Sequence, residues 1–383
     1  MKPPVKPSAV LVAMLLLAGC APTPVKPFAG PPDRSRFTED QKVVWQASDD
    51  QDTAFENSGA TLDDPTLQAY LQGVVNRMYP EFNGAIRVHL LKSTVPNAFM
   101  MGNGSCYVNL GILPLLQDEA QLAMVLGHEG IHFVNQHGVA ERGYASSTAA
   151  TGMILGVIVP IIAPAIAYSS IFGYSRDMET QADQQGYMRF LRAGYDPEEA
   201  VAPFVALDQY SQAMAIKESY FYADHPKLQS RIAYFKAKAA DSTPTGVTGR
   251  AAYVEATQAA RLWVLQELQS RRDYKALIFF LEDKSRLAEY PAWADYYLGR
   301  AYELRASEGD AARAEAIYRN LVATSPAFAP AYAALGETLM RKGSDAEATR
   351  MFQTYVKLAP AAPDRAYIEA YLKQLSAKPG NGN

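Results

Sequence analysis

Two histidines and a glutamate lie within one helical turn of each other in an apolar stretch of the chain. His128, Glu129 and His132 form the pattern His-Glu-x-x-His inside residues 125–134. Histidines four residues apart on a helix share a face, so both can reach a single zinc ion. Glu129 is placed to serve a metal-bound water. The pattern predicts a metal site, and the alternative is two surface histidines on an ordinary core helix.

Capping and periodicity predict the limits of this helix. Asp118 with Gln121 three residues later indicates a capping box, and apolar residues then recur at helical spacing. Gly138 predicts the end of the helix. His137 would then project away from the face that carries the metal-binding pair. We expect His137 to interact with carbonyls at the helix end, with metal ligation as a minor alternative.

A catalytic zinc site needs one more protein ligand than the two histidines supply. The metzincin arrangement would place a histidine six residues after His132, but that residue is Gly138. Residues 173–186 instead offer Glu179 as a ligand on a second helix. Asp183, one turn later, could accept the outer N–H of a ligand histidine and fix its tautomer. The alternative is a solvated acidic helix face.

Three motifs occur in a fixed order along the chain. They are His128-Glu-x-x-His132, Tyr174-Ser-Arg-x-x-Glu179-x-x-Ala-Asp183-x-x-Gly186 and His225-Pro226-x-x-x-x-Arg231-Ile232. With them the chain resembles the gluzincin peptidases of the HtpX and CAAX-prenyl-endopeptidase superfamily, and among these the periplasmic BepA-like members with tetratricopeptide repeats. The resemblance implies a zincin-like domain and one Zn²⁺ per chain, bound by His128, His132 and Glu179. It also implies Glu129 as the general base.

Other residues of these motifs are less firmly assigned. The resemblance places His225 near the metal, either as an extra ligand that shuts the site or as an oxyanion stabiliser. The alternative is a loop histidine without a partner. Arg231 is explained at least as well by a structural salt bridge as by a role in the site. Gly130 and Gln181 depart from the family pattern, where an aliphatic and an acidic residue are commoner; Gly130 should weaken its helix slightly.

The N-terminal segment has the features of an export signal. In residues 1–19, two lysines precede a short apolar run, and Leu-Ala-Gly before Cys20 looks like a lipobox. We therefore expect a bacterial lipoprotein, cleaved before Cys20 and anchored through it on the periplasmic side of the outer membrane. The proline-rich residues 20–36 would form a tether. Cys106 then lacks a disulfide partner, and we interpret it as a buried hydrophobe rather than a nucleophile.

Two β-like stretches precede the catalytic helix. They are residues 86–91 and 97–110, and the second is interrupted at residues 102–104, as a hairpin would be. In related peptidases the strand before this helix is an exposed edge that lines the cleft. A substrate backbone would then pair with Ser105, Cys106, Tyr107, Val108 and Asn109. An ordinary internal strand is the alternative. Asp64-Pro65 opens a helix that should pack against the catalytic helix.

The chain is expected to be mainly α, of α+β type, with two domains. Residues 37–240 would form the zinc metallopeptidase domain with a small sheet. Residues 250–376 would form an all-α tetratricopeptide-repeat solenoid that binds peptides or partner proteins, and residues 377–383 a disordered tail. Residues 149–168 are apolar for about the length of a bilayer span, but one crossing would split the metal site. We expect a hydrophobic hairpin that packs on the core or enters the membrane surface.

These features predict a zinc-dependent endopeptidase of the bacterial envelope that degrades misfolded or stalled periplasmic and outer-membrane proteins. The net charge of −4 without a basic stripe argues against a nucleic-acid partner. One alternative is an outer-membrane protein assembly factor or chaperone whose repeats recruit the insertion machinery, with proteolysis secondary or gated. Another is zinc-dependent hydrolysis of a non-peptide amide in the cell wall.

Overall fold

The computed structural model describes residues 25–147, 174–216, 228–243, 245–283 and 291–377. The expectations for the export signal, Cys20, the apolar residues 149–168, His225 and the C-terminal tail lie outside these ranges. The chain divides into two compact units. The first contains residues 1–109, 118–208 and 216–249, and the second contains residues 110–117, 209–215 and 250–383.

A small mixed sheet lies in the first unit. Its strands are β1 (Arg87–Leu91), β2 (Ala98–Met100) and β3 (Ser105–Asn109), in the order β1-β3-β2. β2 and β3 pair antiparallel as the predicted hairpin, with Phe99 opposite Tyr107. β1 pairs parallel with the other side of β3. β3 is therefore the central strand and its residues are all buried, so the prediction of an exposed edge at Ser105–Asn109 is wrong.

Two helices cover one face of this sheet, α3 (Pro65–Met78) and α4 (Glu119–Val134). Each begins at an aspartate that caps it: Asp64 accepts a hydrogen bond from the backbone N–H of Leu67, and Asp118 accepts one from that of Gln121. The buried residues of α3 are the predicted apolar face, Leu67, Leu71, Val74, Val75 and Met78. The two helices pack against each other, as predicted.

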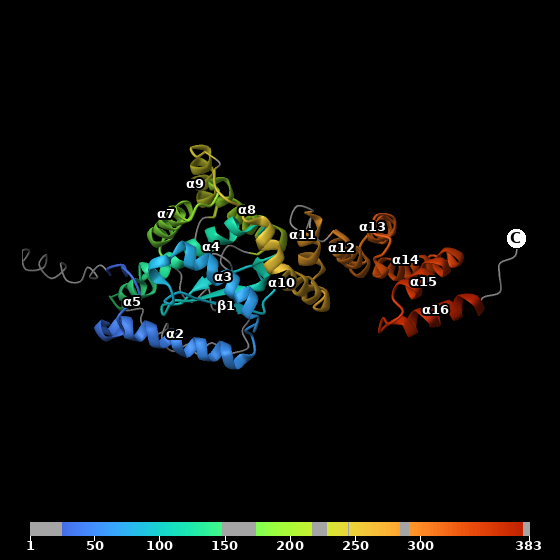
Figure 1. The fold of residues 1–383 in the computed structure, drawn as a ribbon, viewed down its shortest axis with the longest axis horizontal. Coiled ribbons are helices and arrows are strands. Elements are labelled where there is room, and N and C mark those ends of the chain that lie inside the picture. Colours follow the sequence, from blue (N-terminus) through green and yellow to red (C-terminus); the bar gives the residue numbers. More distant parts are fainter. Residues whose placement is uncertain (1–24, 148–173, 217–227, 244, 284–290, 378–383) are drawn as a thin grey trace, which may run out of the picture. The chain divides into compact units, whose positions relative to one another are not determined.

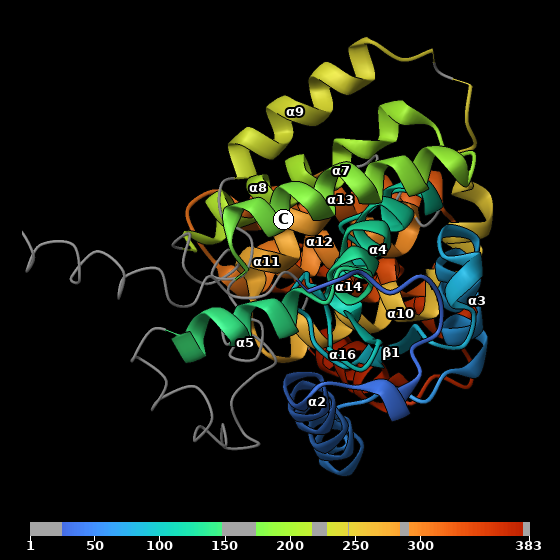
Figure 2. The same cartoon turned by 90° about the vertical axis from the view of Figure 1, so that its left-hand side faces the viewer.

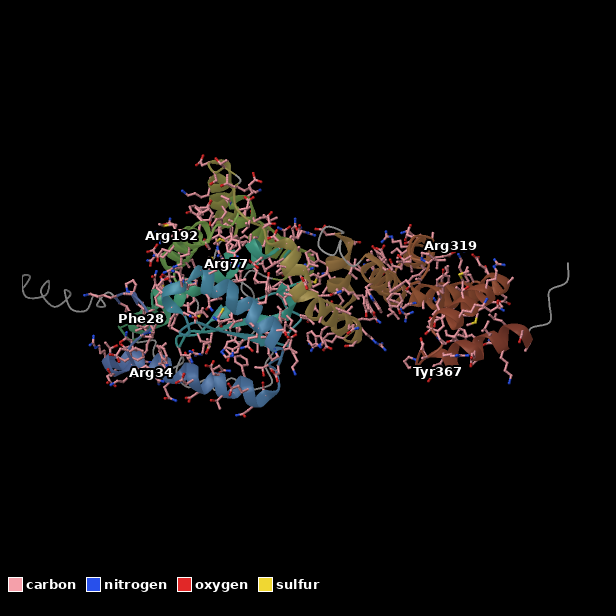
Figure 3. All side chains as sticks on the ribbon, in the orientation of Figure 1. Phe28, Arg34, Arg77, Arg192, Arg319 and Tyr367 are labelled. Atoms are coloured by element: carbon pink, nitrogen blue, oxygen red, sulfur yellow. The ribbon has the colours of Figure 1, made fainter. Side chains whose placement is uncertain are left out.

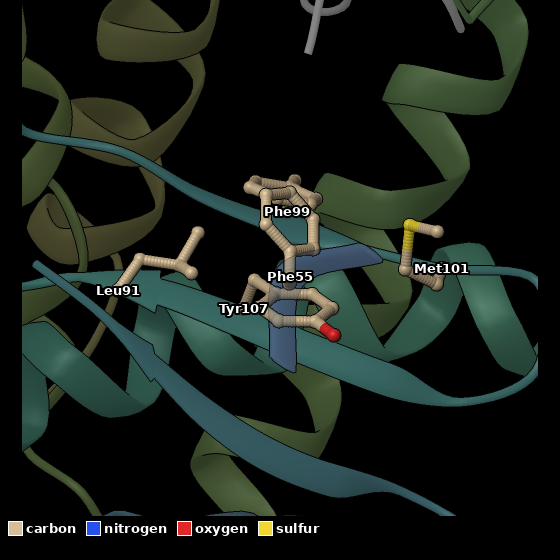
Figure 4. Packing of buried hydrophobic residues seen from close by; sticks show 5 residues of the cluster. All are labelled: Phe55, Leu91, Phe99, Met101 and Tyr107. Carbon is tan, nitrogen blue, oxygen red and sulfur yellow. The ribbon is translucent and has the colours of Figure 1, made fainter. Parts of the chain in front are cut away.

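Helix α2 (Glu39–Ser58) lies on the opposite side of the sheet (Figures 1 and 2). Asp52 accepts hydrogen bonds of 2.7 Å from the hydroxyls of Ser105 and Tyr107 in β3. Phe55 enters a cluster of buried side chains together with Leu91, Phe99, Met101 and Tyr107 (Figure 4). Helix α2 therefore covers the second face of the sheet.

Further helices complete the first unit on the side of α4. They are α5 (His137–Ser147), α7 (Arg176–Arg192) and α9 (Leu228–Ala240). Helix α8 (Ala202–Met214) lies between α7 and α9 in the sequence, and its residues are divided between the two units. Both views show α7 beyond α4 and α9 outermost (Figures 1 and 2). Among the described residues, no helix combines the length and the apolar character that a membrane crossing requires.

The second unit is built largely from successive helices, as predicted. They are α10 (Arg250–Ser270), α11 (Tyr274–Glu282), α12 (Pro291–Arg305), α13 (Asp310–Thr324), α14 (Ala329–Arg341), α15 (Asp345–Leu358) and α16 (Arg365–Ala377). Gly299 of α12 lies against the Tyr318 ring of α13, and Gly336 of α14 lies against the Phe352 ring of α15. Arg319 of α13, which is labelled in Figure 3, pairs with Glu347 of α15 at 2.6 Å. The two glycine contacts repeat one helix-pair packing along the chain.

Candidate metal centre

The structure brings three predicted ligand residues together. The Nε2 atoms of His128 and His132 are 3.1 Å apart. The Glu179 carboxylate places one oxygen 3.5 Å from Nε2 of His128 and the other 3.4 Å from Nε2 of His132. All three residues are at most 3% exposed. His128, His132 and Glu179 bring their ligand atoms close enough together to hold a metal ion. Among the described histidine, cysteine and acidic residues, this is the group that does so.

The spacing of these atoms fits a tetrahedral zinc site. Ligands at about 2.0–2.1 Å from zinc in a tetrahedron lie about 3.4 Å from one another. The two Nε2 atoms are 3.1 Å apart, and each lies 3.4 or 3.5 Å from a different oxygen of the Glu179 carboxylate, so each of these separations is close to that value. Two imidazole nitrogens and one carboxylate oxygen are also a ligand set found in catalytic zinc sites, where the fourth position is left to water or substrate.

A close contact between two glycines sets the distance from α7 to α4. A Cβ atom on Gly186 would lie 2.9 Å from the backbone C and O of Gly127 and 3.0 Å from the backbone N of His128. Only glycine lets the two helix backbones approach this closely. Glu179 lies two turns before Gly186 on α7, so the same approach carries its carboxylate to the histidines. The motif contains Gly186, but its contact with Gly127 is not readable from the sequence.

Gly130 has a similar explanation. A Cβ atom there would lie 2.3 Å from the ring of Tyr79. Tyr79 is 1% exposed, and its hydroxyl donates a hydrogen bond to the carbonyl of Gly127 in α4. Burial raises the pKa of Tyr79, so the phenol stays protonated and remains a donor. The departure from the family pattern at Gly130 therefore makes room for a ring that packs on the metal-binding helix.

Asp183 and Arg231 support His128, and Nη1 of Arg231 also lies 3.9 Å from the Glu179 carboxylate. Asp183 Oδ1 lies 2.9 Å from Nδ1 of His128. Arg231 donates to both oxygens of the same carboxylate, from Nε to Oδ2 at 2.9 Å and from Nη2 to Oδ1 at 2.7 Å. Burial alone would raise the pKa of Asp183, but Arg231 and His128 hold it at about 2. The carboxylate is therefore charged and can accept a proton from Nδ1 of His128, although Nη2 of Arg231 also lies 3.0 Å from that nitrogen. The tautomer with its proton on Nδ1 is the one that leaves the Nε2 lone pair facing the cluster.

The protonation state of His128 agrees with metal binding. Burial, and then the nearby Arg231 guanidinium, lower the pKa of His128. A neutral imidazole is the form that binds a metal. Arg231 is 8% exposed and also lies 4.3 Å over the ring of Phe204. Arg231 thus forms the structural salt bridge considered from sequence. Its partner is Asp183, which contacts the ligand His128, so the bridge also helps to position that ligand.

The prediction that His137 projects away from the metal-binding face is wrong. Helix α4 ends at Val134 rather than at Gly138, and Gln136 has a positive φ of 55° that turns the chain before α5. This turn brings Nδ1 of His137 to 2.9 Å from Nδ1 of His132. His137 is 3% exposed, and burial holds its pKa at about 4. The prediction assumed one continuous helix.

Two further residues frame the site. Tyr174 stacks on the His132 ring with a centroid separation of 4.0 Å and an angle of 16° between the planes. Its motif was noted from sequence, but its partner was not. Glu129 is 4% exposed in α4. Burial and the nearby Glu129 carboxylate raise the pKa of Cys106, which keeps this thiol protonated and agrees with its interpretation as a buried hydrophobe.

Comparisons with known proteins agree with this geometry. Residues 63–239 match the model of peptidase family M48. These residues form an M48 peptidase domain. Residues 305–376 match a tetratricopeptide repeat model. The M48 domain contains every described residue of the candidate metal centre, and the repeats follow it in the predicted order.

Relatives of two kinds are similar to parts of this chain. A mitochondrial metalloendopeptidase OMA1 from Schizosaccharomyces pombe is 30% identical over 38% of this chain and 44% of its own length. A putative beta-barrel assembly-enhancing protease from Vibrio cholerae is 23% identical over 62% of this chain and 53% of its own length. The beta-barrel assembly-enhancing protease of Escherichia coli is 22% identical over 49% of this chain and 42% of its own length. The chain thus spans about half the length of these relatives.

Proposed function

We propose that this chain is a zinc-dependent endopeptidase of the bacterial envelope that cleaves unfolded or misassembled proteins. The observation that carries the proposal is the convergence of two imidazole nitrogens and a carboxylate oxygen within an M48 domain. His128, His132 and Glu179 would hold the ion. Glu129, buried on the same helix as the two histidines, would act on the water.

A bound zinc ion would polarise the attacking water and the scissile carbonyl group. Glu129 would accept a proton from the water as it attacks and then pass that proton to the leaving amine. Asp183, held charged by Arg231, would keep His128 in the tautomer whose Nε2 lone pair faces the ion. The burial of these groups excludes bulk water and strengthens the electrostatic interactions among them.

Several observations support an envelope role and protein substrates. Residues 1–20 resemble a lipoprotein signal that ends at Cys20. Two of the relatives described above are named beta-barrel assembly-enhancing proteases. The tetratricopeptide repeats are of a kind that binds peptides or proteins. We propose that the repeats bring client proteins, or an outer-membrane assembly complex, to the peptidase domain.

Cleavage of an unfolded protein tests the activity. The purified chain, loaded with zinc, should cleave casein, and Glu129→Gln should reduce the rate by about 10²–10⁴ while zinc content stays at one per chain. Glu81→Gln is the matched control, because Glu81 is a partly exposed carboxylate that pairs with Arg189. Full cleavage by Glu129→Gln would rule out its role as general base. Turnover of muropeptides without cleavage of casein would favour a cell-wall amidase.

A second function is favoured by the repeats and by the wording of the relatives' names. The chain would assist outer-membrane protein assembly by recruiting the insertion machinery, with proteolysis secondary or gated. Complementation separates the two functions, since an assembly role should survive Glu129→Gln and a protease role should not. His225, which lies outside the described residues, is our candidate for the gate.

A further inference from the structure

His132 has a side-chain partner on the side of its ring away from the metal cluster. Its Nδ1 lies 2.9 Å from Nδ1 of His137, and the ring planes meet at 74°. Nε2 of His137 lies 3.4 Å from the amide oxygen of Gln181 in α7. A chain of three polar side chains therefore runs from the candidate ligand, through His137, to a residue two positions after Glu179.

The protons of this chain can be placed from the chemistry of the ring nitrogens. Two facing imidazole nitrogens form a hydrogen bond only if one donates and the other accepts. Nε2 of His132 faces His128 and Glu179, and it must keep its lone pair to bind an ion. Its Nδ1 therefore carries the proton and donates to His137. His137 then carries its own proton on Nε2, directed at the acceptor oxygen of Gln181.

The backbone turn that places His137 is itself held in position. Gln136 adopts a φ of 55°, a backbone conformation that residues other than glycine rarely adopt. Its amide donates to the backbone carbonyl of Lys26 at 2.6 Å and accepts from the amide of Gln41 at 2.6 Å. Phe28 also donates from its backbone N–H to the carbonyl of Val134 at 2.8 Å. The segment before α2, together with Gln41 in the first turn of α2, therefore fixes the turn between α4 and α5.

We propose that His137 is a positioning residue that fixes the tautomer and the ring orientation of His132, with Gln181 as the outer acceptor. The inference rests on the proposed function, because it assumes that His132 binds the metal. His128 receives the same support from Asp183. The two ligands differ in one respect: His128 donates to a charged carboxylate, whereas His132 donates to a neutral imidazole.

Cobalt binding by the full chain tests this role without relying on activity. His137→Phe keeps the bulk of the ring and removes the acceptor, so cobalt affinity measured against a chelator should fall about 10–100-fold. The visible absorption bands of the cobalt form should also shift. His137→Asn can place an oxygen near the position of Nδ1 and should restore affinity to within about threefold of wild type.

Controls separate this proposal from the metal site itself. His89→Phe is the matched control, because His89 stacks on Tyr107 in the sheet and its replacement should leave the cobalt affinity unchanged. Equal affinity in wild type and His137→Phe would overturn the positioning role while leaving the metal site intact. Equal losses in His137→Phe and His137→Asn would also overturn it, since packing alone would then explain the effect. Absence of cobalt binding in wild type would overturn both proposals.

Discussion

Replacing Gly186 by alanine should weaken metal binding by separating α7 from α4. The added Cβ would lie 2.9 Å from the backbone of Gly127, whereas ordinary contact begins at 3.4 Å. Because both neighbours are helix backbone, α7 must move back by about half an ångström. That displacement would carry Glu179 away from the histidines by a similar amount, which is about the tolerance within which such sites must be held.

The size of the effect can be bounded from comparable changes. Overpacking of this kind destabilises a protein by about 1–3 kcal/mol, which in a domain of this size lowers the melting temperature by roughly 3–9 °C. We expect the zinc affinity to fall on the order of tenfold or more. Calorimetry of the metal-free chain measures the first effect, and competition with a coloured chelator measures the second.

Two other glycines provide matched controls for the same substitution. Gly73→Ala, on an exposed part of α3, meets nothing within 4 Å and should stabilise the domain by about 0.5–1 kcal/mol. Gly127→Ala would meet the terminal methyl of Met78 at 2.4 Å, and this flexible group can move, so we expect an intermediate loss. Unchanged zinc affinity and melting temperature in Gly186→Ala would show that the contact between Gly186 and Gly127 does not set the position of Glu179.

Two further predictions concern the charges around the site. Arg231→Met should destabilise the metal-free domain by about 3–5 kcal/mol, because it leaves the buried Asp183 carboxylate without its cationic partner. Arg365→Met, at a partly exposed pair with Glu369, should change the free energy of unfolding by less than about 1 kcal/mol in the same calorimetric assay. The pKa of His137 is lowered to about 4 in the folded chain, so only the unfolded chain takes up this proton below about pH 6.5. The contribution of His137 to the free energy of unfolding should therefore be fully present above about pH 7, and it should be lost progressively from about pH 6.5 towards pH 4. Over this pH range the melting temperature of His137→Asn should fall less steeply than that of the wild type. Parallel curves of melting temperature against pH would contradict the attribution of this pH dependence to His137.

The sequence predicted those parts of the site that depend on local spacing. The histidines of α4 and the acidic residues of α7 each lie on one helix, so periodicity places them on a common face before any tertiary contact is known. The caps at Asp64 and Asp118 were predicted for the same reason, since a cap involves residues only three positions apart. The hairpin of β2 and β3 was likewise predicted from the glycines of its turn.

The remaining features depend on tertiary contacts that no local pattern encodes. β3 is central because β1, from an earlier part of the chain, pairs with its second side. His137 reaches His132 because the chain turns at Gln136, where a residue other than glycine adopts a positive φ. The contact between Gly127 and Gly186 joins two helices that are distant in sequence. In each case the sequence shows the residue but not its partner.

The most direct test of this account is X-ray absorption at the zinc edge on the purified chain, combined with metal analysis. We predict one zinc per chain, bound only through nitrogen and oxygen, with two imidazoles among the ligands, and loss of this signal in Glu179→Ala. Binding through sulfur, a third imidazole in place of the carboxylate, or an unchanged spectrum in Glu179→Ala would contradict the proposed site.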